Sequence, residues 1–223
     1  MLDVDQTPES PGLYAWYATF QASNQDWKFK PDGASDGAIL GFLNLLRRYA
    51  SYYEPLPIDL AGRGAYGSRW EGLLEIDFPL RPEESESTDE DRLGVLLDTL
   101  GSEDRRRVMA TLLKAATPVF SSPLYIGVAE NLQNRLKQHK RDFEQADEWL
   151  RDHPEDAQVI KLRGKSFGQR AAARGISMNN LEVWVIHLEE NDQNGVTVKE
   201  VRKTAESTEW LLHRLYSPIL GKQ

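Results

Sequence analysis

The segment Leu181–Leu188 (LEVWVIHL) constrains the fold more than any other part of the sequence, because apolar and polar residues alternate along it. Alternation with a period of two is typical of a strand that buries one face. Two more strands are expected, the aromatic-rich Leu13–Phe20 and the short apolar Pro123–Val128. Trp70–Phe78 alternates in part and is a weaker strand prediction. The strands are separated by long segments with helical patterns, so the sequence predicts an α+β fold.

Apolar residues at helical spacing predict six helices. Their expected ranges are Ala38–Tyr53, Asp91–Leu100, Glu103–Ala116, Leu132–Trp149, Phe167–Arg174 and Thr204–Tyr216. Val159–Arg163 is ambiguous, and Asn191–Gly195 is expected to form a turn. The glycine-rich stretch around Gly62, Gly64 and Gly67 is expected to be a loop, and no Gly-Lys-Ser/Thr follows it, which excludes a Walker phosphate loop.

Length and composition limit the class of protein. A chain of 223 residues is long enough for one large domain or for a compact core with an insertion. It contains no cysteine, which removes disulfides, thiolate zinc sites and cysteine nucleophiles. No stretch approaches the run of about 18 apolar residues that spans a bilayer, and the acidic N-terminus does not resemble a signal peptide. The simplest expectation is a cytoplasmic protein without a membrane partner.

Charge is unevenly distributed along a chain whose formal net charge is −8. Acidic residues concentrate within 83–91, inside the stretch Arg81–Asp91 that we expect to be a solvated loop. The segment 159–174 is free of acidic residues and carries five basic ones. These are Lys161, Arg163, Lys165, Arg170 and Arg174. If the protein binds nucleic acid, we expect this basic segment to lie along the phosphate backbone.

The chain carries two strand motifs and, after them, a series of polar and charged residues at particular spacings. The expected strands carry Gly12-Leu13-Tyr14 and Tyr125-Ile126-Gly127. Arg135 lies ten residues past Tyr125, and His139 lies four past Arg135. Glu209 follows in the first turns of the expected last helix, and Pro218 stands nine residues further on. In order and spacing this series resembles the GIY-YIG nuclease family, over residues 12–20 and about 121–223.

The resemblance implies a particular architecture. Its core would be a small, three-stranded, mostly antiparallel sheet flanked by helices, built from residues 1–20 and 121–223. Residues 21–120 would then be an inserted, mainly helical subdomain that recognises DNA or binds a protein partner. The family joins its two tyrosine motifs by a short hairpin, whereas this chain separates them by about a hundred residues.

The resemblance also implies a catalytic set made of Tyr14, Tyr125, Arg135, His139 and Glu209. Tyr14 would activate the attacking water with help from His139, and Glu209 would hold the metal. The chemistry agrees with these roles, because Mg²⁺ (or Mn²⁺) accepts a single carboxylate with water ligands and arginine binds phosphate oxygens. Gly12 and Gly127 would serve the backbone, where a side chain would block close approach.

Each of these residues also has a purely structural explanation. Buried strand tyrosines usually pack in a core, a helix arginine is usually solvated, and a glutamate in a first helical turn favours the helix dipole. One position departs from the family, because Gly221 stands where an asparagine is usual. Glycine offers no side-chain hydrogen bond, so its presence would reduce activity, be compensated elsewhere or mark a site that only binds. Because the candidate catalytic residues are all present, we expect an active enzyme.

Three functions therefore compete. The first is a metal-dependent DNA endonuclease of the restriction, anti-phage defence or mobile-element kind, with RNA not excluded as substrate. The second is a non-catalytic nucleic-acid-binding subunit that retains the fold, which the negative net charge favours. The third is a protein-interaction module in which the acidic loop and the segment 21–120 bind a partner or a second copy of the chain.

Overall fold

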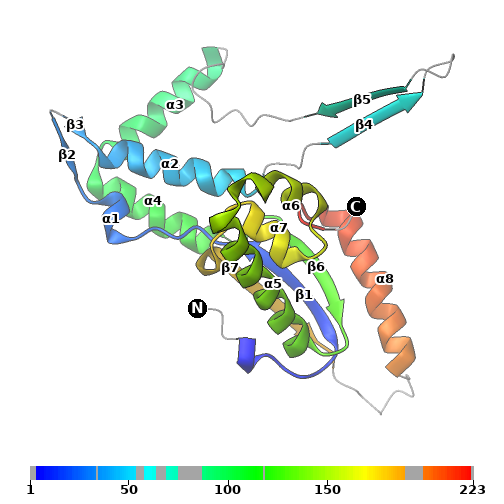
Figure 1. Cartoon of the computed structure of the whole chain (residues 1–223). Helices are drawn as coiled ribbons and strands as arrows, with labels where there is room; N and C mark the ends of the chain where they lie inside the picture. Colours follow the sequence, from blue (N-terminus) through cyan, green and yellow to red (C-terminus); the bar gives the residue numbers. More distant parts are fainter. Residues whose placement is uncertain are drawn as a thin grey trace. The chain divides into compact units, whose positions relative to one another are not determined.

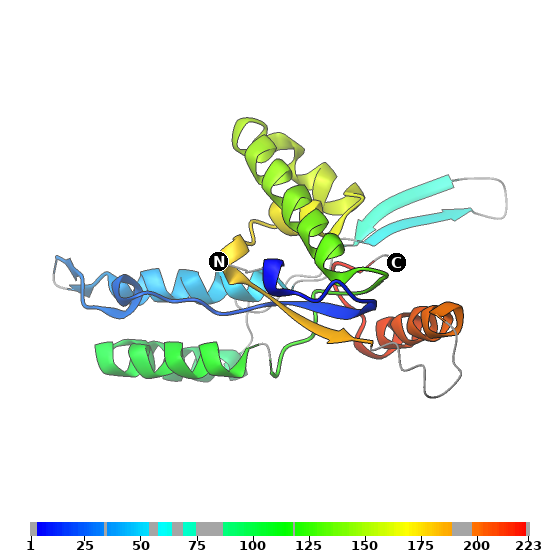
Figure 2. The same cartoon turned by 90° about the horizontal axis from the view of Figure 1, so that it is seen from below.

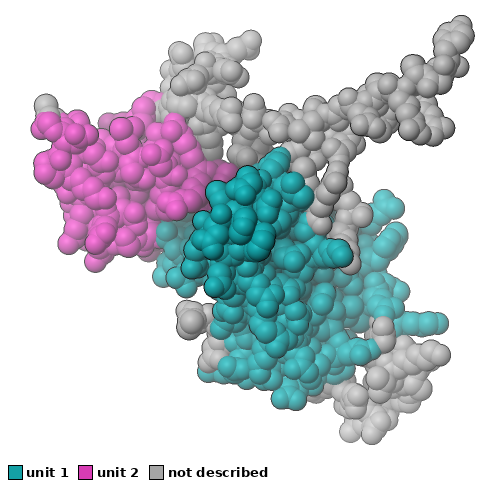
Figure 3. Space-filling model, in the orientation of Figure 1, with its two compact units in different colours: residues 1–21, 113–223 teal, residues 22–112 magenta. Residues whose placement is uncertain are grey.

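The structure is a computed structural model that describes residues 4–33, 35–53, 58–63, 69–74, 87–117, 119–188 and 198–221. The chain divides into two compact units (Figure 3). Unit 1 comprises residues 1–21 and 113–223, and unit 2 comprises residues 22–112. The proposed division was 1–20 with 121–223 for a core and 21–120 for an insertion.

Unit 1 is built on a three-stranded sheet in the order β6-β1-β7 (Figure 1). The strands are β1 (Gly12–Ala18), β6 (Tyr125–Ala129) and β7 (Leu181–His187), and both pairings are antiparallel. Tyr14 faces Gly127 on one side and Val185 on the other. The α+β class and the small antiparallel sheet flanked by helices are therefore confirmed. The N-terminal strand occupies the centre because both later strands pair with it.

One face of this sheet is covered by helices α5 (Leu132–Asp152) and α7 (Phe167–Ala173), as Figure 2 shows. Alternate β1 residues, Tyr14, Trp16 and Ala18, are buried, and the Trp16 ring stacks on Phe167 at 5.1 Å. Gly168 lets α7 approach α5, because a Cβ there would meet the backbone nitrogen of Phe143 at 2.7 Å. The short helices η1 (Val4–Gln6), η2 (Pro154–Asp156), α6 (Ala157–Arg163) and η3 (Met178–Asn180) complete this part.

Helix α8 (Val198–Tyr216) lies beside β6, and the chain after it returns to the sheet. The backbone N–H of Leu220 donates to the carbonyl of Leu124 at 2.7 Å. The Leu220 carbonyl accepts from Arg170 Nη2 at 2.5 Å, and the Leu220 side chain is fully buried. Hydrogen bonds through both the N–H and the carbonyl of Leu220 thus hold the segment that follows α8 in place.

Among the described residues, unit 2 contains helices and two short antiparallel strand pairs. Its elements are α1 (Asn24–Trp27), β2 (Pro31–Asp32), β3 (Ser35–Asp36), α2 (Ala38–Ser51), β4 (Ile58–Arg63), β5 (Arg69–Leu74), α3 (Ser87–Leu100) and the start of α4 (Glu103–Ala116). β2 pairs with β3 and β4 pairs with β5, each antiparallel.

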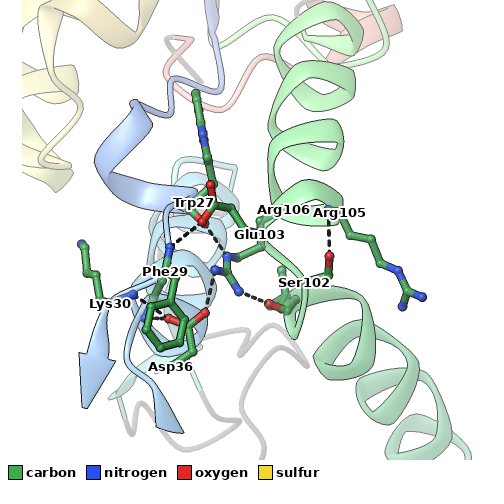
Figure 4. A network of polar contacts seen from close by, with 10 residues as sticks. Trp27, Phe29, Lys30, Asp36, Ser102, Glu103, Arg105 and Arg106 are labelled. Atoms are coloured by element: carbon green, nitrogen blue, oxygen red, sulfur yellow. Dashed lines mark hydrogen bonds and ion pairs between the residues drawn. The ribbon is translucent and has the colours of Figure 1, made fainter.

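A buried arginine holds much of unit 2 together (Figure 4). Arg106 is completely buried and donates from Nε to the Trp27 carbonyl at 2.9 Å. Its Nη1 donates to the Leu100 carbonyl, and its Nη2 pairs with Asp36 at 2.7 Å. Burial alone would raise the pKa of Asp36, but the N–H groups of Lys30 and Ala38 and the Arg106 charge hold that pKa below its ordinary value. The network closes because every polar group in it has a partner.

Three expectations about elements were wrong. Gly62 lies in β4 rather than in a loop, because 58–63 pairs with 69–74. Helix α3 begins at Ser87, so the end of the expected acidic loop is helical. Helix α8 begins at Val198, which places Glu209 in the middle of the helix and removes the helix-dipole explanation for it. Asn191–Gly195 lies outside the described residues. No helix among the described residues is long and apolar enough to cross a membrane.

Candidate active site

Tyr14 is the centre of a polar cluster between β1 and α5. Its side chain is 2% exposed, and its hydroxyl lies 2.8 Å from His139 Nε2. Arg135 Nε donates to the same hydroxyl at 3.2 Å. Both partners come from α5, where a spacing of four residues puts them on one face. The helix begins directly after β6, because the Asn131 side chain caps it by accepting from the N–H of Asn134.

Tyr125 completes this cluster from the neighbouring strand β6. Its ring centroid lies 6.0 Å from that of Tyr14 and 5.7 Å from that of His139. Four of the five predicted catalytic residues thus lie together although 125 positions separate Tyr14 from His139. The antiparallel pairing of β1 with β6 is what brings the two tyrosine motifs side by side.

The two motif glycines leave room for this packing. A Cβ at Gly127 would lie 2.5 Å from the Tyr14 hydroxyl oxygen and 2.6 Å from its Cζ. A Cβ at Gly12 would lie 2.7 Å from Leu132 Cδ1 and would also meet the Ile186 carbonyl. A Cβ atom does not approach non-bonded atoms this closely, so a larger residue at either position must displace its neighbours. Gly127 in particular permits the position of Tyr14.

Protonation of the cluster follows from its burial. Burial, followed by the nearby Arg135 charge, lowers the pKa of His139 to about 4. His139 is therefore neutral at pH 7, and its Nε2 accepts the Tyr14 hydroxyl proton while Arg135 donates to the Tyr14 oxygen. The hydrogen then resides on Nδ1, which is buried and has no hydrogen-bond partner among the described residues.

The tyrosine itself is held as a neutral phenol. Burial and then Tyr125 raise the pKa of Tyr14 far above its ordinary value, although Arg135 opposes this. Burial would lower the pKa of Arg135, but Tyr14 and Tyr125 outweigh it and leave that pKa raised. Arg135 nevertheless remains an exposed residue, so its guanidinium is where solvent meets the cluster.

Glu209 lies on α8, one turn before His213, which contacts the sheet and Tyr125. His213 Nε2 lies 3.0 Å from the Ile126 carbonyl and 3.9 Å from Glu209 Oε1. The His213 ring meets the Tyr125 ring edge-on, with centroids 6.4 Å apart. The side chains of Glu209 and His213 are 27% and 23% exposed, so both are partly accessible to solvent.

The basic segment is divided between surface and interior. Arg170 is 6% exposed and donates to the carbonyls of Gly164 at 2.7 Å and Leu220, so the expectation that it lies along a phosphate backbone is not supported. Burial lowers its pKa. Arg174 is half-buried, Lys161 is half-buried, and Lys165 is exposed. The Arg163 side chain lies outside the described residues. Lys165 is therefore the clearest surface cation of this segment.

The site offers a metal ion one carboxylate rather than a full set of protein ligands. The described residues contain no group of three or more His, Asp or Glu side chains able to hold a metal ion. Glu209 offers a partly exposed carboxylate, and the neighbouring His213 Nε2 is already directed at the Ile126 carbonyl. One carboxylate with water ligands suits Mg²⁺, which retains most of its hydration shell, so the residues fit a hydrated ion.

Two features of α8 were not predicted as parts of a site. His213 lies one turn from Glu209, and its Nε2 donates to the Ile126 carbonyl of the sheet. Trp210 is 63% exposed, and the Arg214 guanidinium lies 5.3 Å from the centroid of its ring. The spacing of four residues between Trp210 and Arg214 was the available signal, since it puts them on one helix face.

Comparison with protein-family models, with curated proteins and with solved structures finds no match for this chain.

Proposed function

We propose that the chain is a metal-dependent endonuclease of the GIY-YIG type that hydrolyses phosphodiester bonds of DNA, with unit 1 as its catalytic core. One observation carries this proposal. The Tyr14 hydroxyl is bonded at once to a neutral histidine, His139, and to an arginine, Arg135. A buried tyrosine that serves packing alone needs one partner for its hydroxyl, whereas this one links a proton acceptor to an exposed cation.

The cluster supports a proton path. Water that attacks phosphorus must lose a proton, and the Tyr14 oxygen accepts it as the Tyr14 proton passes to His139 Nε2. The transfer must be concerted, because burial disfavours a lasting phenolate at Tyr14. Arg135 stabilises the oxygen during the transfer, since its Nε already donates to it.

The cluster also supports charge stabilisation at phosphate. Arg135 is exposed and can donate to phosphate oxygens as charge develops on them. Glu209 would hold Mg²⁺ or Mn²⁺, which would supply Lewis-acid stabilisation of the same oxygens. Glu209 and Arg135 are the two members of the set that reach solvent, and the proposal requires that one phosphodiester group contacts both.

Residues near Glu209 are suited to contact with a nucleic acid. Trp210 and Arg214 form an exposed aromatic and cationic pair on the turn of α8 that carries Glu209. Bases stack on such aromatic surfaces, and cations such as Arg214 and Lys165 attract the backbone. These local charges act at short range, so the net charge of −8 does not oppose the assignment.

The direct test is cleavage of plasmid, single-stranded DNA and RNA in Mg²⁺ and in Mn²⁺. We expect Glu209→Ala and Arg135→Ala to lose at least about 100-fold in rate, as loss of one transition-state contact does. Matched controls are Glu206→Ala, an exposed carboxylate on α8, and Arg141→Ala, an exposed arginine on α5. EDTA should abolish cleavage. If both site variants cut as well as the parent, the assignment is wrong.

A second function, a non-catalytic partner-binding subunit, is favoured by the surface of unit 2. Val108 and Leu112 lie one turn apart on α4 and are 55% and 64% exposed, and Val95 on α3 is 69% exposed. Apolar side chains grouped on a surface often bind a protein partner. Absence of DNA affinity at low salt, together with a stable protein complex in a pull-down, would support this function instead.

A further inference from the structure

His213 has contacts on three sides that fix its imidazole beside Glu209. Its Nε2 lies 3.0 Å from the Ile126 carbonyl of β6. A carbonyl only accepts, so Nε2 carries the hydrogen. The same nitrogen lies 3.9 Å from Glu209 Oε1. The ring edge contacts Tyr125, at a centroid distance of 6.4 Å. One N–H group is thus directed at the sheet that carries Tyr125 and lies close to the carboxylate.

Gly221 bounds the same imidazole from the far side. A Cβ at this position would lie 3.1 Å from His213 Cε1 and 3.0 Å from the Pro218 carbonyl oxygen. The backbone cannot easily withdraw, because Leu220 is bonded through its N–H to Leu124 and through its carbonyl to Arg170. A side chain at residue 221 therefore meets both the His213 ring and Pro218, and one of these neighbours must shift by a few tenths of an ångström.

We propose that His213 is the positioning residue for Glu209, and that residue 221 must be glycine because the His213 ring occupies the adjoining space. This inference rests on the proposed function. His213 fixes α8 to β6 through the Ile126 carbonyl and so sets the position of the Glu209 carboxylate, which lies 3.9 Å from its Nε2. Groups behind a metal ligand orient it in this way, and their loss costs about 10- to 100-fold in metal affinity or activity.

The proposal reverses the expectation from the family resemblance about residue 221. If a missing asparagine weakened the site, Gly221→Asn would raise activity. If the His213 ring needs that space, Gly221→Asn displaces the ring and lowers activity. The two explanations therefore predict opposite signs for one substitution.

The experiment measures Mn²⁺ binding by electron paramagnetic resonance and plasmid cleavage on the full chain. The variants are His213→Ala, His213→Gln, Gly221→Asn and Glu209→Ala, with His153→Ala as control because His153 is half-buried and stacks on Trp149, away from the cluster. We expect His213→Ala and Gly221→Asn to weaken Mn²⁺ binding and cleavage by about 10- to 100-fold. His213→Gln should recover part of both, because its amide N–H can still donate to the Ile126 carbonyl.

Thermal melting shows whether each variant is folded, and Mn²⁺ binding and cleavage are compared among folded variants. Mn²⁺ binding and cleavage that depend on Glu209 but are unchanged in His213→Ala would overturn the positioning role and leave the proposed function intact. Higher activity in Gly221→Asn would overturn the explanation of the glycine. A parent chain that neither binds Mn²⁺ nor cleaves would overturn the proposed function, and the inference would fall with it.

Discussion

Arg106 in unit 2 and Arg135 in unit 1 are both helix arginines held by hydrogen bonds, yet their surroundings differ. Arg106 is completely buried, and each of its three side-chain nitrogens has a partner within the unit. Arg135 is exposed and donates through Nε to the hydroxyl of Tyr14. The first guanidinium is wholly committed to protein oxygens, whereas the second still faces solvent.

The groups around the two arginines differ in the same way. Asp36 and the two carbonyls around Arg106 form a closed network (Figure 4). Around Arg135, the buried His139 keeps an Nδ1 without a hydrogen-bond partner among the described residues. Burial of an unpaired polar group costs stability, so the Arg135 cluster is less favourable in this respect than the Arg106 network. The Arg106 network is therefore a closed structural network, whereas the Arg135 cluster keeps an exposed cation and a ring nitrogen without a partner in the described part of the chain, which is the arrangement on which the proposed function depends.

The largest expected effect comes from breaking the closed network. Arg106→Ala leaves Asp36 and two carbonyls without their partner and should destabilise unit 2 by about 3–5 kcal/mol. Hydrogen exchange of the amides in α2 and α4 measures this loss locally.

The control for this variant is Arg105→Ala on the same helix. Arg105 pairs with Asp98 at 3.1 Å, and the two side chains are 59% and 82% exposed. Exposed pairs contribute about 0–1 kcal/mol, so exchange should scarcely change. Equal effects of the two variants would show that burial of Arg106 does not matter.

Acid should affect the two units in sequence. The pKa of His139 is about 4 in the folded chain against an ordinary value of 6.5, so between these pH values the unfolded chain binds a proton that the folded chain does not. Stability of unit 1 therefore falls as the pH drops from about 6.5 to about 4, by about 3 kcal/mol. The pKa of Asp36 is lowered from 3.8, so its contribution in unit 2 is lost only at still lower pH.

Urea titrations at pH 7 and pH 5 test this order. The NMR indole signal of Trp16 reports unit 1, because its ring meets His139 edge-on, and that of Trp27 reports unit 2. His139→Gln should remove the loss at pH 5 seen through Trp16, while His153→Gln should not. An unchanged pH dependence in His139→Gln would mean that His139 does not titrate in this range.

Local patterns in the sequence predicted much of the fold. The alternation at 181–188 and the aromatic run at 13–20 predicted two strands that now pair as β7 and β1. The spacing of Arg135 and His139 placed both on one helix face, and the structure brings them to Tyr14. These features depend on neighbours in sequence, where periodicity directly reports which face is buried.

Tertiary contacts decided what the sequence could not show. Arg106 and Arg170 look like solvated helix residues, but each is buried by partners 70 or 50 positions away. Helix α8 begins before its apolar spacing does, so Glu209 was placed too near its start. The contact of Gly221 with His213 depends on how the segment after α8 returns to Leu124, which no local pattern encodes.

The smallest expected effect separates buried from exposed cations within the basic segment. Lys165 is exposed, so Lys165→Gln should lower the salt dependence of DNA binding by about 0.9 in log–log slope, the share of one phosphate contact, with no loss of thermal stability. Arg170→Met should leave that slope unchanged but lower the melting temperature, because Arg170 donates to the carbonyls of Gly164 and Leu220. Fluorescence anisotropy with a labelled duplex, at salt concentrations from low to physiological, gives both slopes. A reduced slope in folded Arg170→Met would mean that burial within protein carbonyls does not exclude phosphate contact, and the distinction drawn between Arg106 and Arg135 would lose its physical basis.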